Sequence, residues 1–234
     1  LVADLGAKVI LEVPESLFSL MSGLEGVSQI IVKGEDLPSF EFQCPLLSLP
    51  LFFNTNIDNI PSEERYLFSN VHTVAEWSGR LGLKTKPRIG LVWAGNPDHK
   101  NDHNRSIPLK ELLNSLPEGY EFISLQKDIS ENDQVILGAN QKISTYDKYL
   151  HSYNDTAALI ECLDLVISVD TSVAHLSGAL GKKTLVLLPY LPDWRWLLSR
   201  SDSPWYPSLK LYRQDKRGDW SRALERVFSD LKVL

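Results

Sequence analysis

The sequence is poor in several features that mark particular classes of protein. Only two of its 234 residues are cysteines, Cys44 and Cys162, which is too few for a disulfide framework or a cysteine-rich metal cluster. We therefore expect a reducing compartment and a cytoplasmic protein. No apolar run reaches the roughly 18 residues of a membrane span, so no transmembrane segment is predicted. The 24 basic residues do not outweigh the 30 acidic ones, and the net charge of −6 argues against a nucleic-acid partner.

Motifs of common nucleotide and metal sites are also missing. There is no G-x-G-x-x-G dinucleotide fingerprint, and Leu176 stands where a phosphate-binding P-loop needs its first glycine. No Asp-x-Asp pair is present to hold a metal-bridged diphosphate, and no glutamate follows His99 to complete a zinc motif with His103. We therefore predict neither a metal ion nor a cofactor. A phosphorylated ligand would have to be held by backbone and side-chain donors.

The organisation of the chain changes near residues 83–87, a polar stretch that ends at a proline. The elements predicted before it are strands over 8–13 and 29–33 and helices over 15–22 and 71–81. We interpret residues 1–84 as a partial N-terminal Rossmann-like domain. Because the chain opens at Leu1 within an element, we expect the true start of this domain to lie upstream.

Residues 85–234 alternate regularly between short apolar runs and helical patterns. Apolar side chains at i, i+3, i+4 and i+7 mark the helices, and continuous apolar runs mark the strands. The predicted strands are 88–94, 120–125, 142–145, 163–169 and 184–188, and the predicted helices are 107–116, 131–137, 155–163, 171–180 and 219–233. Alternating units of this kind predict an α/β fold with a parallel sheet that helices cover on both faces.

One candidate binding segment follows the apolar strand that ends at Asp170. A helix is predicted to start there at once, and the free N–H groups of a helix N-terminus bind anions. The hydroxyls of Thr171 and Ser172 would add donors, and His175 lies one turn further along the helix. The segment therefore predicts a diphosphate site. The alternative interpretation is that Asp170 only caps the helix and His175 is a half-buried structural residue.

The second candidate is the polar loop 95–106, which ends at Arg105 and Ser106. Ser106 is placed to cap the predicted helix 107–116, and arginine suits bidentate phosphate contact. A solvated loop with a capping serine is the alternative.

Gln126 and Lys127 close another strand, where they could contact a base and a phosphate, although a surface lysine fits equally well. The tryptophans of 192–196 and 204–207 could stack on a base or sugar, but we favour a packing role.

Several ordered segments carry a resemblance to a known family. They are Gly90–Pro97, Asn101–Asp102, Asn104–Ser106, Ser124–Lys127, Asp155–Ile160, Leu163–Leu176, Pro192–Leu198, Asp202–Pro207 and Arg213–Trp220, with Gly6–Val13 and Cys44–Pro50 nearer the start. Together they resemble the bacterial glycosyltransferase family 9 domain, which is heptosyltransferase-like, in the type that follows tetratricopeptide repeats.

The resemblance implies a GT-B-like fold, in which two Rossmann-like parallel-sheet domains face each other across a cleft. Residues 1–84 would be the incomplete acceptor-side domain, and residues 85–234 would bind the nucleotide-sugar donor. Helix 219–233 would cross back to the N-terminal domain. The implied reaction is a metal-independent, inverting transfer of a sugar from a nucleoside-diphosphate sugar to an acceptor hydroxyl. The acceptor could be a peptide, a protein or a glycan.

The resemblance also implies roles for individual residues. His175 and Arg105 would stabilise the departing diphosphate, and the residues expected to bind the donor are Asn96, Ser106, Gln126, Lys127, Asp170, Thr171 and Ser172. The family's proposed catalytic base is an aspartate after a first N-terminal strand. That strand has no counterpart here, so we expect the base to lie outside this chain. Two alternatives remain: a non-catalytic binding or scaffold module, and a sugar-nucleotide epimerase that needs no acceptor.

Overall fold

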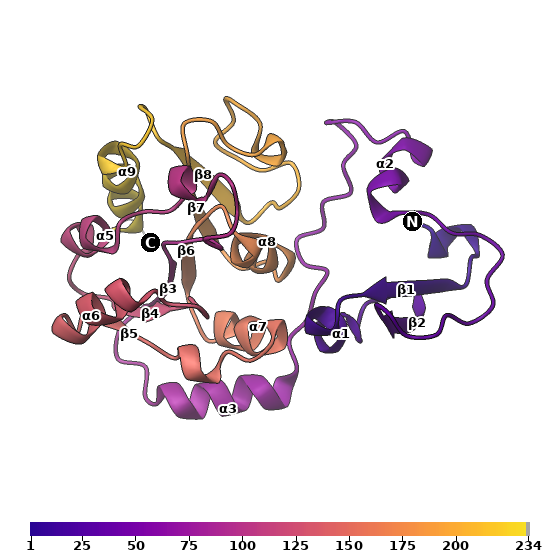
Figure 1. The fold of residues 1–234 in the computed structure, drawn as a ribbon, viewed down its shortest axis with the longest axis horizontal. Helices are drawn as coiled ribbons and strands as arrows, with labels where there is room; N and C mark the ends of the chain where they lie inside the picture. Colours follow the sequence, from indigo (N-terminus) through magenta and orange to yellow (C-terminus); the bar gives the residue numbers. More distant parts are fainter. Residues whose placement is uncertain (233–234) are drawn as a thin grey trace.

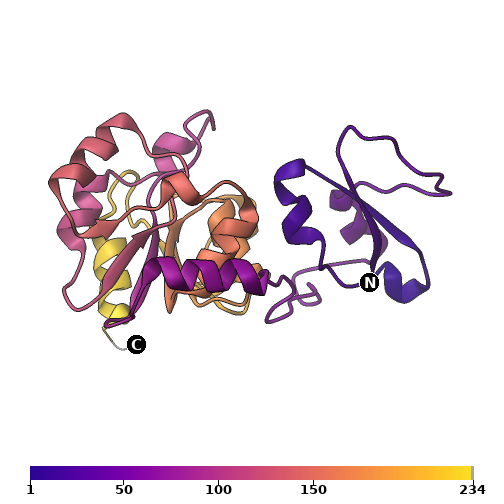
Figure 2. The same cartoon turned by 90° about the horizontal axis from the view of Figure 1, so that it is seen from below.

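The computed structural model describes residues 1–232, so residue 233 of the predicted final helix lies outside the described residues. Two separate β-sheets are present, and they lie in two lobes joined by extended chain (Figures 1 and 2). One sheet has two strands and comes from the start of the chain, and the other has six. All strand pairs in both are parallel, which confirms the predicted α/β class.

The six-stranded sheet has the order β5-β4-β3-β6-β7-β8. Its strands are β3 (Arg88–Val92), β4 (Glu121–Ser124), β5 (Ile143–Ser144), β6 (Leu165–Val169), β7 (Thr184–Leu188) and β8 (Leu209–Arg213). The first five confirm predicted strands. Strand β8 was not predicted, although the alternation of Leu209 and Leu211 with exposed Lys210 is the period-two pattern of an edge strand.

The central strands β3, β6 and β7 are buried at every position. Their near-continuous apolar sequences reflect this, because a parallel strand covered on both faces has no side that must be polar. Gly90 of β3 pairs with Ile123 on one side and Val166 on the other. A Cβ on this glycine would lie 2.6 Å from Leu163 Cδ1, so glycine allows close packing beneath the strand.

Helices cover both faces of this sheet (Figure 1). On one face α5 (Leu109–Ser115) packs against α6 (Glu131–Ala139) and α9 (Ser221–Leu231), and on the other α7 (Tyr153–Glu161) packs against α8 (Ser172–Ala179). The apolar stripe of α9 is buried against β7, β8 and α5. The prediction that this helix crosses back to the N-terminal domain is therefore wrong for the described residues, because its whole apolar face is used on the larger sheet.

Helix α3 (Val71–Leu81) packs against α7 and so belongs spatially to the larger sheet. Buried Arg88 at the start of β3 donates hydrogen bonds to the carbonyl oxygens of Leu81 and Gly82, which ties the end of the helix to the sheet. The connection between the two lobes therefore lies before α3, upstream of the boundary predicted at residue 84.

The N-terminal lobe is built around one β–α–β unit. Strand β1 (Val9–Val13), helix α1 (Glu15–Met21) and strand β2 (Val27–Val32) confirm predicted elements, and a short 3₁₀ turn, η1 (Ala3–Leu5), precedes them. Beyond β2 this lobe contains only short helical turns, η2 (Leu46–Ser48) and α2 (Leu49–Phe52). Large apolar side chains such as Phe42, Leu47 and Leu51 are exposed there.

The two lobes meet along α7 and α8. Helix α1 packs against α7, and the backbone N–H groups of Tyr66 and Leu67 both donate to the carbonyl oxygen of Ala179 at 3.0 Å. Gly181 follows with a φ of +68°, and a Cβ there would lie 2.6 Å from the carbonyl oxygen of Glu64. The end of α8 is thus the point at which the connecting chain is attached.

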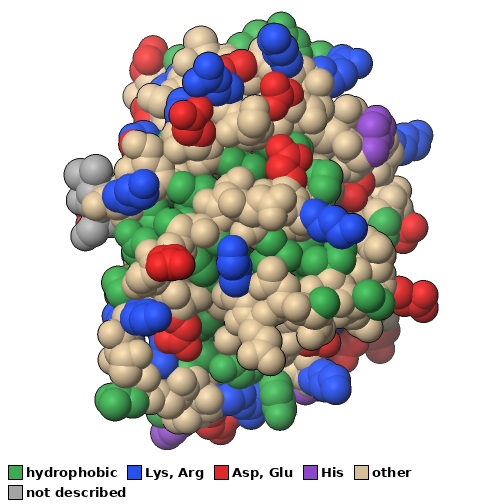
Figure 3. All heavy atoms as spheres, turned by 90° about the vertical axis from the view of Figure 1, so that its left-hand side faces the viewer, with side chains coloured by type: hydrophobic (Ala, Val, Ile, Leu, Met, Phe, Trp, Pro, Cys, Tyr) green, Lys and Arg blue, Asp and Glu red, His purple; other side chains and the backbone are tan. Residues whose placement is uncertain are grey.

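The face that carries α5, α6 and α9 is shown in Figure 3. Basic and acidic side chains are interspersed on it, so the described residues form no continuous basic stripe on this side. No helix within residues 1–232 has the length and hydropathy that crossing a membrane requires.

Candidate functional site

The strand order reverses direction between β3 and β6, which are neighbours in the sheet but far apart in sequence. From β3 the chain runs outward through β4 and β5, then returns to β6 and continues to β8 on the other side. In open α/β sheets the loops at such a switch point diverge and leave a crevice beyond the strand ends, where ligands bind. Here the diverging segments are loop 95–106 after β3 and the Asp170–Thr171 turn after β6.

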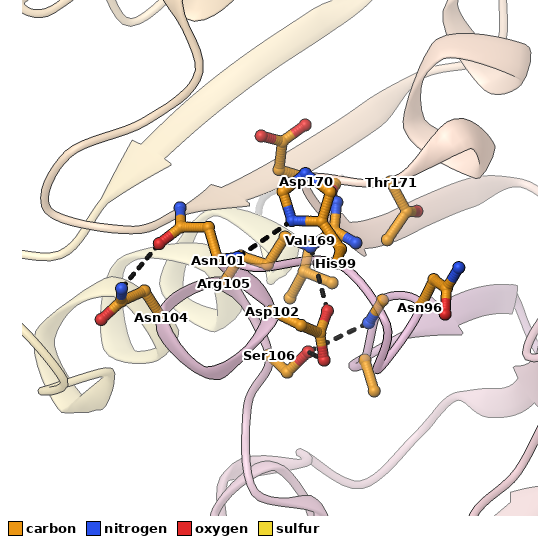
Figure 4. A network of polar contacts seen from close by, with 12 residues as sticks. Asn96, His99, Asn101, Asp102, Asn104, Arg105, Ser106, Val169, Asp170 and Thr171 are labelled. Atoms are coloured by element: carbon orange, nitrogen blue, oxygen red, sulfur yellow. Dashed lines mark hydrogen bonds and ion pairs between the residues drawn. The ribbon is translucent and has the colours of Figure 1, made fainter.

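The N-terminus of α8 lies at this crevice, directly after β6. Thr171 is the N-cap residue, but its side chain makes no capping bond and instead lies 3.2 Å from the Ser168 hydroxyl. Ser172 opens the helix and is exposed. The first N–H groups of α8 are therefore not satisfied by a capping side chain. The alternative interpretation of Asp170 as the cap is wrong, and its carboxylate points away from Asp102 in Figure 4.

Loop 95–106 reaches across the switch point through Arg105. Its Nη1 donates to the carbonyl oxygen of Asp170 at 2.9 Å, and its Nε pairs with Asp102 Oδ1 at 3.0 Å (Figure 4). Both side chains are largely buried, at 14% and 16% exposed. Arg105 and Asp102 thus form a fixed link between the two candidate segments. Sequence reasoning counted Asp102 among the segments of the resemblance but gave it no role, although an Asp-x-x-Arg pair in a polar loop could have indicated one.

Ser106 has a different role from the one predicted. It accepts a hydrogen bond from the Gly95 N–H at 3.0 Å and donates to Asp102 Oδ2 at 2.9 Å. It ends the short helix α4 (Asp102–Arg105), while α5 begins only at Leu109 after Pro108. The predicted cap of a helix 107–116 is wrong, because Pro108 sets the helix start two residues later. Of the two helix N-termini predicted to bind an anion, only the start of α8 lies at the site.

Gly95 is required by this arrangement. A Cβ at that position would lie 2.4 Å from Arg105 Nη2 and 2.4 Å from Asp102 Oδ1. The Asp102–Arg105 pair therefore lies directly over the backbone of Gly95, and a larger residue there would displace these two side chains.

Three other predicted ligand residues make internal hydrogen bonds. Buried Gln126 accepts from the Ala94 N–H at 3.1 Å, so it fixes the end of β3. Asn96 accepts from the Asp98 N–H at 3.0 Å and shapes the loop, and Lys127 Nζ reaches the His151 carbonyl oxygen at 3.5 Å. Gln126 and Asn96 thus hold the backbone at the switch point, whereas Lys127 bonds to His151, just before α7. Their contact with a ligand stays a prediction.

His175 lies one turn into α8 with its ring held on two sides. The Trp196 ring stacks on it with a centroid distance of 4.9 Å, and its Nδ1 lies 3.2 Å from the Tyr206 hydroxyl. Burial lowers the pKa of His175 below its ordinary value, and the nearby Asp170 carboxylate opposes this only in part. The ring is therefore neutral at pH 7. Trp196 is fully buried, which confirms the packing role favoured for that tryptophan, whereas Trp194 is 63% exposed.

Comparisons with known proteins place this fold. No protein-family model matches the chain. Protein FlbA of Caulobacter vibrioides (strain ATCC 19089 / CIP 103742 / CB 15) is 25% identical over 179 residues, which are 74% of this chain and 30% of FlbA. The chain thus spans about a third of the length of this curated relative.

Two solved structures superpose on most of the chain. The structure of E. coli ADP-heptose lps heptosyltransferase II gives a TM-score of 0.57 at 16% identity, covering 97% of this chain and 89% of that one. The glycosyl transferase family 9 structure from Veillonella parvula DSM 2008 gives a TM-score of 0.57 at 11% identity, covering 94% and 82%. The chain therefore has the GT-B-like fold of these glycosyltransferases, and the resemblance to family 9 is confirmed at the level of the fold.

Proposed function

We propose that this chain forms the donor-binding part of a glycosyltransferase, which transfers a sugar from a nucleoside-diphosphate sugar to an acceptor hydroxyl. The observation that carries the proposal is the α8 N-terminus at the switch point of a GT-B-like sheet. Its leading N–H groups lack a capping side chain, and the hydroxyls of Thr171 and Ser172 lie beside them. This is the arrangement that binds a phosphate group at a helix start.

The chemistry expected of this site is stabilisation of a leaving diphosphate. Negative charge grows on the diphosphate as its bond to the sugar breaks, and donors that are already oriented stabilise that charge without reorganising. Arg105 would act mainly by holding the Asp170 carbonyl and so the direction of the helix start, because its guanidinium is already bound to Asp102. His175 would act as a neutral donor. Loss of one such donor costs roughly 2–4 kcal/mol of transition-state stabilisation.

The test is calorimetric titration of the chain with ADP, UDP and GDP in the presence of a chelator. ADP is the first choice, since the E. coli neighbour is an ADP-heptose enzyme. We expect saturable binding of one nucleotide, and the Ser172→Ala and Thr171→Val variants should weaken it about tenfold each through loss of a hydrogen bond to a charged group. Ser62→Ala, an exposed serine in the connecting chain, is the matched control and should bind as the unaltered chain does.

A result in which a nucleotide binds but neither variant changes its affinity would place the nucleotide elsewhere and overturn the site. Binding of no nucleotide by the folded chain would overturn the donor-binding proposal for this chain. An inverting transfer also needs a general base within hydrogen-bond reach of the acceptor hydroxyl. We propose that a segment outside this chain supplies it, and that the acceptor is a peptide, a protein or a glycan.

A second candidate, a nucleotide-binding module without catalysis, is favoured by one observation. The charge of Arg105 is compensated by Asp102 inside the protein, which leaves less positive charge for a leaving group. Incubation of a protein that includes this chain with nucleotide sugars separates the possibilities. Transfer to an added acceptor supports the enzyme, an altered sugar nucleotide without acceptor supports an epimerase, and binding without turnover supports the module.

A further inference from the structure

A tyrosine outside the predicted site is the hydrogen-bond partner of His175. The hydroxyl of Tyr206, which follows the tryptophan-rich segment before β8, lies 3.2 Å from His175 Nδ1. The Tyr66 side chain lies close to Tyr206 and adds to the rise in the pKa of Tyr206. Tyr66 belongs to the connecting chain, and its backbone N–H is bound to Ala179 at the end of α8. The His175–Tyr206 hydrogen bond, between side chains 31 residues apart, thus lies beside the connecting chain.

The packing around this hydrogen bond leaves the imidazole little freedom. Trp196 covers one face of the His175 ring at an interplanar angle of 19°, and the Tyr206 ring lies 5.7 Å away at 60°. Tyr206 itself fits because residue 178 is glycine, where a Cβ would lie 2.5 Å from the tyrosine ring. The ring of His175 is therefore set in orientation, and what remains open is which of its nitrogens carries the hydrogen.

The chemistry of the two groups decides this. A phenol hydroxyl donates well, whereas the unprotonated nitrogen of a neutral imidazole accepts well. Burial raises the pKa of Tyr206 far above its ordinary value, so the tyrosine retains the proton that it would donate. Burial lowers the pKa of His175, although Asp170 and Asp193 oppose the shift, and nearby Arg195 favours the neutral ring. A neutral ring that accepts at Nδ1 must carry its hydrogen on Nε2.

We infer that Tyr206 is a positioning residue that holds neutral His175 in the Nε2–H tautomer by donating to its Nδ1. His175 Nε2 has no hydrogen-bond partner among the described residues and is not among their side-chain atoms sealed from solvent. Its N–H is thus available to an acceptor such as a diphosphate oxygen. The part of the inference that concerns a ligand rests on the proposed function, while the part that concerns the tautomer does not.

The experiment is ¹⁵N NMR of the imidazole nitrogens in the full chain at pH 7.5, assigned with a His175→Gln variant. We expect the signals of a neutral ring protonated at Nε2. In Tyr206→Phe the ring should convert to a mixture of tautomers, because the phenol that selects one of them is gone. Tyr190→Phe is the matched control, since that exposed tyrosine follows β7 and has no side-chain bond to His175, and it should leave the spectrum unchanged.

Wild-type signals from Nδ1–H, or an unchanged tautomer in Tyr206→Phe, would overturn the inference. If Tyr206→Phe does not fold, the spectrum of the unaltered chain decides the matter: signals from Nε2–H support the inference, and signals from Nδ1–H overturn it. ADP titrations run in parallel, in which Tyr206→Phe should raise the dissociation constant about fivefold. Absence of ADP binding to the unaltered chain counts against the proposed function only, because the NMR result stands without a nucleotide.

Discussion

The two sheets of this protein differ in how completely they are covered, although both are parallel. In the larger sheet helices cover both faces, and β3, β6 and β7 are buried at every residue. In the smaller sheet only Val13 of β1 and Ile31 of β2 are buried. Parallel sheets are stable when both faces are covered, so the larger sheet can hold loop ends in one geometry and the smaller one depends on its contacts with α7 and α8.

The candidate site lies on the well-covered sheet for this reason. The Asp102–Arg105 link, the Gln126 amide and the turn after β6 all start from buried strand ends. The exposed apolar residues, by contrast, gather in the N-terminal lobe and the connecting chain. The stability of the site and the stability of the N-terminal lobe should therefore be separable, and four substitution experiments test this.

The largest difference should come from truncating leucines in the two regions. Leu159 of α7 is fully buried, and Leu159→Ala should lower the free energy of unfolding by about 2–5 kcal/mol because it leaves a cavity. Leu47, which is 83% exposed in the N-terminal lobe, should tolerate the same change within about 0.5 kcal/mol. Urea denaturation followed by circular dichroism measures both. Similar losses of unfolding free energy in the two variants would contradict the difference in burial between the two regions.

The junction between the regions is tested by two glycines with positive φ. Gly181→Ala should cost about 2–4 kcal/mol, because a left-handed backbone is strained and the new Cβ would collide with the Glu64 carbonyl oxygen. Gly218, with a φ of +78° and open space around it, should show only the backbone strain of about 1–2 kcal/mol. The difference between the thermal unfolding midpoints of the two variants measures the cost of the collision with the Glu64 carbonyl oxygen alone. Equal costs would mean that the connecting chain moves aside freely.

Within the larger sheet, Gly95→Ala should disturb the site more than the fold. The Cβ would displace the Asp102–Arg105 pair, and we expect a loss of about 1–3 kcal/mol in unfolding free energy together with weaker nucleotide binding. Gly138→Ala, in the open last turn of α6, should instead gain about 0.5–1 kcal/mol. Denaturation combined with calorimetry checks both. If Gly95→Ala binds nucleotide as the unaltered chain does, the Asp102–Arg105 ion pair is not needed for nucleotide binding.

The smallest effect concerns pH. Because the pKa of His175 is lowered on folding, the unfolded chain binds its proton first as the pH falls. The resulting loss of unfolding free energy should be absent above pH 7. It should grow from about pH 6.5 downward until the pH passes the pKa of His175 in the folded chain. In His175→Gln this part of the pH dependence should vanish, which urea titrations at pH 5.5 and 7.5 would reveal. An identical pH dependence in both proteins would mean that His175 is solvated.

The sequence patterns predicted the α/β class and most elements of the larger sheet, because buried parallel strands are apolar throughout and amphipathic helices repeat regularly. They missed β8, where three buried residues share a strand with exposed Lys210. They also predicted the wrong packing for the final helix. An apolar stripe such as that of Leu224 and Phe228 shows that one face of a helix is buried, but it does not show which element buries it.

For the site, the sequence alone determined which residue types follow β3 and β6, and that a helix begins after Asp170. Only the tertiary structure decided that these two segments are neighbours, because the strand order 5-4-3-6-7-8 is not written in any local pattern. The same holds for the Arg105 bond to the Asp170 carbonyl, which spans 65 residues, and for the His175–Tyr206 contact across 31 residues. Local propensities act over one turn or one strand, whereas such contacts depend on how whole elements pack.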